Sequence, residues 1–182
     1  MSRELDVETT VSPSSFAHFV LRVRDLKASV QWYEKLLGMH MVHDGGLVAF
    51  MTYDDEHHRI AMMQTPVTEL ASPGAPGLDH VAYTLNSLGD LLGTYGRLKA
   101  AGIAPALSIN HGPTTSLYYS DPDGNRVEFQ VDNYETVEEL NAWMRTDEFK
   151  ANPIGVVFDP DKLTERYLNG DPLRELLRQG AA

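Results

Sequence analysis

The chain contains an internal repeat, and this feature constrains its fold more than any other. One copy runs from Phe16 to Met39 and the other from Leu78 to Ile103. Each opens with an alternating strand pattern whose third residue is a histidine, His18 or His80. Each then shows a helix-start signal, apolar residues at helical spacing and a closing glycine. We therefore expect two copies of one structural unit.

Each predicted helix is followed by three short strand-like runs, several of them separated by glycine-bearing turns. The runs are 39–43, 47–53 and 58–64 in the first half, and 103–109, 116–120 and 126–131 in the second. The last strands match as Ala61–Gln64 against Val127–Gln130. The offset between the halves is 62 residues at the histidines (80 minus 18) and 66 at these strands (127 minus 61), as expected for a duplicated unit whose loops changed length.

The repeat predicts an α+β fold of paired βαβββ modules. We assign residues 15–65 to the first module, 66–77 to a linker containing SPGAPG, and 78–132 to the second module. Residues 1–14 are expected to be a flexible N-terminus. Two modules that pair edge to edge would form an open, curved sheet around a cleft. Residues 133–182 follow as a C-terminal helical extension, for which a structural cap, a lid over the cleft and an oligomer contact all stay open.

Composition limits the classes of partner. With 42% hydrophobic residues, the chain of 182 residues can bury a globular core. Its net charge of −11 would repel a phosphate backbone or an anionic membrane surface, so we expect neither nucleic acid nor membrane as a partner. The absence of cysteine excludes disulfides and thiolate metal sites and fits a reducing cytoplasm, where we expect the protein. No apolar run approaches the roughly 20 residues that span a bilayer.

Three residues form a candidate metal site. His18 and His80 hold equivalent positions in the repeat, and Glu128 lies between Val127 and Phe129 on the last predicted strand. An inward, unpaired carboxylate would be costly, and a cation would remove that cost. Two imidazoles and one carboxylate are typical of the facial triad of non-haem iron(II) oxygenases. The alternative is a pair of satisfied strand histidines with a surface glutamate.

A fourth ligand is not expected. The strand alignment places Met62 where the second repeat has Glu128. A thioether is a poor ligand for a hard divalent ion. The sequence therefore predicts three protein ligands and leaves the remaining coordination positions to substrate and dioxygen.

Residues 15 to 132 resemble the vicinal oxygen chelate superfamily, and within it the type I extradiol ring-cleavage dioxygenases. The specific signature is HGPTTSLYYSDPDGNRVEF, from His111 to Phe129. The resemblance implies that His18, His80 and Glu128 bind iron(II), with manganese as the alternative because the same ligands suit both ions.

The resemblance also implies catalytic roles for Tyr118, His111 and His58. Tyr118 matches the family's active-site tyrosine, and strand alternation would then turn Tyr119 to the opposite face. His111 lies in the region of a further active-site histidine. His58 matches the second member of a histidine pair and the family's acid–base residue, so His57 is expected to face away.

The expected activity is meta-cleavage of a catechol-type aromatic diol with O2. Val20, two residues after His18, and Phe50, eight residues before His58, are candidate substrate contacts, although either could belong to the core. One alternative is a glyoxalase-type isomerase, which would need a carboxylate where Met62 stands. A small-molecule-binding protein without a metal is the other alternative. We also expect a homo-oligomer, because exposed sheet edges often need covering.

Overall fold

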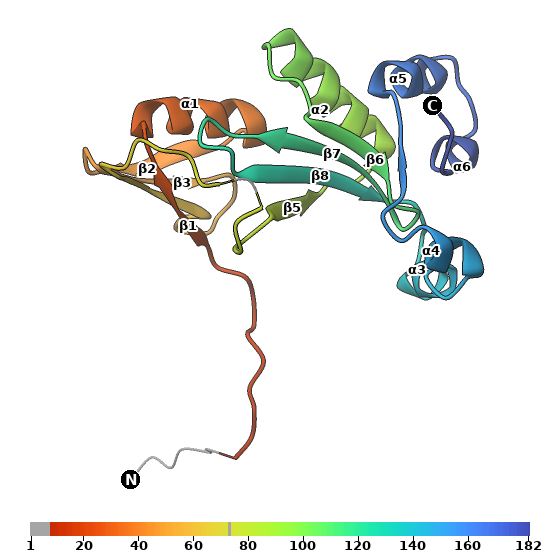
Figure 1. Cartoon of the computed structure of the whole chain (residues 1–182), viewed down its shortest axis with the longest axis horizontal. Helices are drawn as coiled ribbons and strands as arrows, with labels where there is room; N and C mark the ends of the chain where they lie inside the picture. Colours follow the sequence, from red (N-terminus) through yellow and green to blue (C-terminus); the bar gives the residue numbers. More distant parts are fainter. Residues whose placement is uncertain (1–7, 73) are drawn as a thin grey trace.

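The computed structural model describes residues 8–72 and 74–182, and within them the repeat folds as two βαβββ modules (Figure 1). The first module consists of β1 (Phe19–Val23), α1 (Leu26–Leu37), β2 (His40–Asp44), β3 (Val48–Thr52) and β4 (Ile60–Gln64). The second consists of β5 (His80–Thr84), α2 (Leu88–Ala100), β6 (Leu107–Asn110), β7 (Thr114–Ser120) and β8 (Arg126–Asp132). The predicted α+β fold is confirmed.

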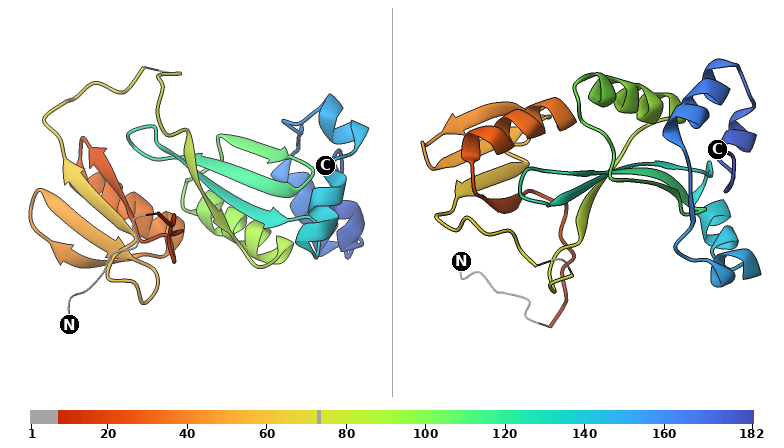
Figure 2. Two further views of the ribbon diagram at one scale, coloured as in Figure 1. Left: turned by 90° about the horizontal axis from the view of Figure 1, so that it is seen from below. Right: turned by 45° about the horizontal axis from the view of Figure 1, so that its top comes forward.

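Each module builds one curved, open sheet. The strand order is β1-β4-β3-β2 in the first sheet and β5-β8-β7-β6-β9 in the second, where β9 (Val156–Val157) comes from the C-terminal extension. In each module the first strand along the chain pairs in parallel with the last, β1 with β4 and β5 with β8. The other strand pairs are antiparallel. Helices α1 and α2 cover the same side of the two sheets, which leaves the opposite faces of both modules bare of helix (Figures 1 and 2).

The helices begin and end where the sequence indicates. The Asp25 carboxylate accepts a hydrogen bond from the Ala28 N–H and caps α1, and the Ser87 hydroxyl accepts one from the Asp90 N–H and caps α2. Helix α1 ends at Gly38, whose left-handed φ of 66° suits glycine. The apolar faces of both helices are buried in one continuous core.

The strand register corrects the alignment of the two last strands. In the second module, Ala82 follows His80 by two residues and lies beside Glu128. In the first module, Val20 follows His18 by two residues and lies beside Ala61. Ala61, and not Met62, is therefore the counterpart of Glu128. Met62 is fully buried on the helix side of the sheet. The prediction for Met62 was wrong because loop lengths hide a one-residue shift that only the paired strands define. The conclusion that the first module supplies no fourth ligand is unchanged, since alanine cannot bind a metal.

A second difference concerns residues 103–106, which were predicted to be strand. Strand β6 starts only at Leu107. The Ile103 N–H instead donates to the Leu98 carbonyl and completes the end of α2. Pro105 also lacks the N–H that a paired strand needs.

The C-terminal extension packs against the second module. It contains α3 (Val137–Trp143), α4 (Asp147–Ala151), β9 (Val156–Val157), α5 (Pro160–Leu168) and α6 (Leu173–Leu176). Strand β9 pairs with β6 and covers that edge of the sheet. Helix α5 lies on α2, where Asp161 accepts hydrogen bonds from Tyr95 Oη at 2.7 Å and from Lys99 Nζ at 2.6 Å. Leu163 and Leu176 are each only 1% exposed, so the extension adds to the core.

The turn DPDGN links the two modules. The Asp123 carboxylate accepts hydrogen bonds from the Arg24 backbone N–H and, at 2.6 Å, from Arg24 Nε at the start of α1. Tyr33 Oη of the same helix donates to the buried Asp121 at 3.3 Å. The turn therefore holds the first module against the end of β7. Within residues 8–72 and 74–182, none of the helices combines the length and apolar character needed to cross a membrane.

Candidate metal and substrate site

The helix-free face of the second module gathers a polar cluster around Glu128. Alternation along β8 turns Val127 and Phe129 into the core beneath α2 and places Glu128 on the opposite face, where it is still only 4% exposed. His80 Nε2 lies 3.0 Å from Glu128 Oε2. A nitrogen donor and a buried carboxylate at this spacing have the chemistry that a divalent cation prefers.

Tyr118 joins this cluster from β7. It lies directly opposite Glu128 in the β7–β8 ladder, and its ring meets the His80 ring edge-on at a centroid distance of 5.2 Å. Burial, and then the negative charge of Glu128, raises the pKa of the Tyr118 hydroxyl well above its ordinary value. Tyr118 therefore keeps its proton at neutral pH and can donate a hydrogen bond. The neighbouring Tyr119 is fully buried on the helix side, which confirms the predicted alternation.

His111 connects the cluster to the C-terminal extension. Its Nε2 lies 3.0 Å from Tyr118 Oη, and its Nδ1 lies 2.5 Å from the Ile154 carbonyl oxygen. A carbonyl can only accept, so Nδ1 carries the proton and Nε2 accepts from the Tyr118 hydroxyl. Gly155 allows the close approach, since a Cβ there would lie 2.3 Å from the Asn110 carbonyl oxygen. The sequence contained no signal for this contact with Ile154.

The first module presents a second, mainly aromatic group of residues. His18 is exposed, one residue before β1, and its ring lies 4.2 Å from the ring of His58 between centroids. His58 in turn stacks on Phe50 at 4.7 Å with an interplanar angle of 16°. Val20 is 49% exposed and shares this face with Phe50, because both strands place these residues beside Ala61.

The two adjacent histidines differ in environment. The His57 side chain is 67% exposed and lies 3.3 Å from Glu56, whereas His58 is half-buried against His18 and Phe50. The two Nδ1 atoms are 2.6 Å apart, so one ring donates to the other. Burial lowers the pKa of the His58 imidazole, and the neighbouring His18 and His57 lower it further. His58 is therefore neutral near pH 7.

The predicted site residues thus form two groups. His80, Glu128, Tyr118 and His111 lie together in the second module, while His18, His58, Phe50 and Val20 lie together in the first. Across the part of the chain that the structure describes, no three His, Cys, Asp or Glu side chains are close enough together to hold a metal ion. The three-ligand set of His18, His80 and Glu128 stays a prediction.

Sequence reasoning missed Asp79 and Arg126, which adjoin the cluster. The Asp79 carboxylate lies 2.7 Å from His80 Nδ1 and also accepts a hydrogen bond from Arg126 Nη2. The Arg126 guanidinium lies 5.7 Å from the centre of the Tyr118 ring. The available signal was the pair Asp79-His80 itself, because a carboxylate often orients a metal-binding imidazole.

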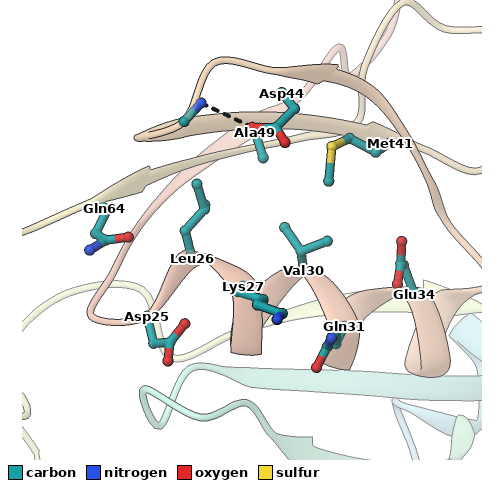
Figure 3. Close-up of a pocket in the computed structure, with 11 residues that line it drawn as sticks. Asp25, Leu26, Lys27, Val30, Gln31, Glu34, Met41, Asp44, Ala49 and Gln64 are labelled. Atoms are coloured by element: carbon teal, nitrogen blue, oxygen red, sulfur yellow. Dashed lines mark hydrogen bonds between the residues drawn. The ribbon is translucent and has the colours of Figure 1, made fainter.

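A hollow of about 470 Å³ lies elsewhere, between α1 and strands β2 and β3 (Figure 3). Leu26 and Val30 point into it from α1, and Met41 and Ala49 face them from the strands. None of the predicted site residues lines it.

Residues 15–129 match the model of the Glyoxalase/Bleomycin resistance protein/Dioxygenase superfamily. The chain belongs to this superfamily. Two proteins from Rhodococcus globerulus are similar to this chain over most of its length. Biphenyl-2,3-diol 1,2-dioxygenase 2 is 46% identical over 90% of this chain and 86% of its own length. Biphenyl-2,3-diol 1,2-dioxygenase 3 is 45% identical over 92% of this chain and 88% of its own length.

Solved structures agree on the fold. A glyoxylase/bleomycin resistance protein/dioxygenase domain from Frankia sp. EAN1pec superposes with a TM-score of 0.59 at 26% identity, covering 69% of this chain and 96% of that one. Lactoylglutathione lyase from Agrobacterium tumefaciens superposes with a TM-score of 0.53 at 22% identity, covering 65% and 94%.

Both Rhodococcus relatives are extradiol dioxygenases, so the resemblance carried by the segment from His111 to Phe129 is confirmed.

Proposed function

We propose that this superfamily member is an iron(II)-dependent extradiol dioxygenase that opens a catechol-type ring beside its two hydroxyls with O2. The observation that carries the proposal is the buried Glu128, which faces His80 at 3.0 Å and lies directly opposite Tyr118. The Rhodococcus relatives, named as biphenyl-2,3-diol dioxygenases, support the same reaction.

The donor set fits iron(II), with manganese(II) as the alternative ion. A carboxylate that is only 4% exposed needs a positive partner, and a cation held with His80 supplies one. His18 is assigned as the third ligand, because it holds the position of His80 in the other repeat and its ring is open to solvent. Iron(II) would supply chelation of both substrate hydroxyls and the one-electron chemistry with O2 that side chains lack.

Tyr118 is proposed to orient the bound diol. Its raised pKa keeps the hydroxyl protonated, so that it can donate to an anionic substrate oxygen. The hydroxyl has one proton, which His111 Nε2 accepts in this structure, so the diol oxygen would replace His111 as the acceptor; the Ile154 carbonyl keeps the His111 proton on Nδ1. The C-terminal extension would therefore help to position Tyr118 through His111.

His58 is proposed to move the proton during ring opening. A neutral imidazole can accept a proton from the substrate and return it later. Its lowered pKa keeps it in this form near pH 7. The stacked Phe50 holds the ring in place from one side.

Val20 and Phe50 are proposed to contact the substrate. They form an apolar wall beside His58, on the face that carries His18. Such a wall suits a second aromatic ring, and the names of the Rhodococcus relatives include one. We therefore propose a bicyclic catechol, such as biphenyl-2,3-diol, as the preferred substrate.

The function is tested by loading the protein with Fe²⁺ without oxygen and then adding biphenyl-2,3-diol and air. We expect O2 uptake and a yellow ring-opened product, with catechol itself a poorer substrate. Metal binding without O2 uptake would favour an isomerase, and neither response would favour a binding protein. Glu128→Gln should weaken metal retention, and unchanged iron content would remove Glu128 from the ligand set.

The cellular setting is also a proposal. The lack of cysteine suits a reducing cytoplasm, where we place the protein. All five residues of β2 are exposed, and among the described strands β2 has a partner on one side only. Since such edges are usually covered, we propose a homo-oligomer.

A further inference from the structure

Each module has an arginine beside its histidine. Arg126, the first residue of β8, is paired with His80 in the parallel β5–β8 ladder. In the first module Arg59 lies one residue before β4, and its carbonyl accepts the backbone N–H of Phe19, the residue after His18. The two arginines are therefore counterparts in the repeat, each placed next to a proposed metal ligand.

In the second module the arginine acts through a carboxylate. Arg126 Nη2 donates to Asp79, and the same Asp79 oxygen lies 2.7 Å from His80 Nδ1. A carboxylate accepts only, so Nδ1 carries a proton toward Asp79, and Nε2 is the nitrogen whose lone pair a bound metal would take. That nitrogen is the one that faces Glu128.

In the first module the counterpart arginine, Arg59, contacts the backbone instead. Ala17 stands where the second module has Asp79, and alanine has no side-chain acceptor. Arg59 Nη1 donates to the Phe16 and Ala17 carbonyls at 2.5 and 3.1 Å. The Asp54 carboxylate accepts hydrogen bonds from the same guanidinium at 2.9 to 3.1 Å. The counterpart contact thus places the chain before His18 without selecting the proton position on its ring.

We propose that Asp79, held by Arg126, is a positioning residue that fixes the proton of His80 on Nδ1 and points Nε2 at the metal beside Glu128. This inference rests on the proposed function, because the metal is the one named there. Arg126 also lies over the Tyr118 ring, so one arginine connects the ligand His80 with the proposed substrate donor.

The first test observes the ring itself. Long-range ¹H–¹⁵N NMR on the metal-free Glu128→Ala protein at pH 8 reports which His80 nitrogen carries the proton, because no carboxylate then faces Nε2. We expect the Nδ1–H form in this background and a shift toward Nε2–H when Asp79→Ala is added. Asp79→Asn keeps an acceptor oxygen and should retain most of the Nδ1–H form. An unchanged tautomer in Asp79→Ala would overturn the proposal.

The second test measures Mn²⁺ affinity from the EPR signal of the free ion. Loss of such an orienting partner typically weakens metal binding by about 10- to 100-fold, and we expect this for Asp79→Ala. Asp161→Ala is the matched control: Asp161 is also an exposed, ion-paired carboxylate, with 60% of its side chain exposed against 66% for Asp79, but its partner is Lys99. This control should bind Mn²⁺ like the wild type.

The outcomes separate the two proposals. Equal Mn²⁺ affinity for Asp79→Ala and the wild type would overturn the positioning role even if the enzyme cleaves catechols. Tight Mn²⁺ binding by the wild type without ring cleavage after iron loading would remove only the dioxygenase function. A wild-type protein that binds no Mn²⁺ would overturn the ligand assignment and the positioning role together.

Discussion

Replacing Tyr119 by Phe should stabilise the protein, although Tyr119 is one of its most buried residues. Its side chain is fully buried between the second sheet and α2, and its ring meets Phe129 edge-on at 5.9 Å. Among the described residues, its hydroxyl has no hydrogen-bond partner. Phenylalanine keeps the ring contacts and removes only the unpaired oxygen.

The magnitude follows from two opposing terms. Burying a hydroxyl without a partner costs about 1–3 kcal/mol in protein mutational data. The void left by one oxygen is smaller than a methyl group, so it costs less than about 1 kcal/mol. We expect Tyr119→Phe to raise the free energy of unfolding by about 1 kcal/mol, which for a chain of this length raises Tm by about 2–4 °C.

Tyr118→Phe is the matched control, because it makes the same chemical change one residue earlier on the same strand. It removes the contact to His111 Nε2 at 3.0 Å and should lower the free energy of unfolding by about 0.5–1.5 kcal/mol. Tyr118→Phe should also slow ring cleavage by about 10- to 100-fold, the effect of losing a hydrogen bond to a charged oxygen, whereas Tyr119→Phe should leave the rate unchanged.

The assay is urea and thermal unfolding of the metal-free proteins, followed by circular dichroism. If Tyr119→Phe destabilises the fold as much as Tyr118→Phe does, the Tyr119 hydroxyl has a partner and the reasoning fails. Equal loss of activity in both variants would instead refute the assignment of the two tyrosines to opposite faces.

Three further predictions concern activity, the extension and pH. His58→Ala should retain iron but cleave a catechol about 10²-fold more slowly or worse, and a rate near wild type in an oxygen-electrode assay would end the role of His58. Leu163→Ala, at a site only 1% exposed, should lower the free energy of unfolding by about 2–5 kcal/mol in urea titrations if α5 belongs to the core. Hydrogen bonds from Lys99 and then Tyr95 lower the pKa of Asp161, so its contribution to stability is present above the unfolded pKa of about 3.9 and lost as pH falls through the lower folded pKa. In unfolding measurements, the stability deficit of Asp161→Asn relative to wild type should be smaller at pH 3 than at pH 7; an equal deficit at both would contradict this linkage.

Much of the second module was predictable because its features are local. The alternation around Glu128 and the Tyr118–Tyr119 pair follow from the period of a strand, which any strand of that sequence must obey. The caps at Asp25 and Ser87 likewise depend on residues within one turn of a helix. Relations between separate strands were less accessible, and the misplaced counterpart of Glu128 resulted from counting residues through loops.

The sequence by itself determined the duplicated βαβββ unit, the equivalence of His18 with His80, and the face on which Glu128 lies, because periodicity and capping act over a few residues. Only the tertiary structure decided that Ala61 is the counterpart of Glu128 in the first module, that Asp79 contacts His80 Nδ1, and that Ile154 from the extension reaches His111. Each of these depends on which chain segments pack side by side, and the free energy of that packing comes from the whole core rather than from any one stretch of sequence.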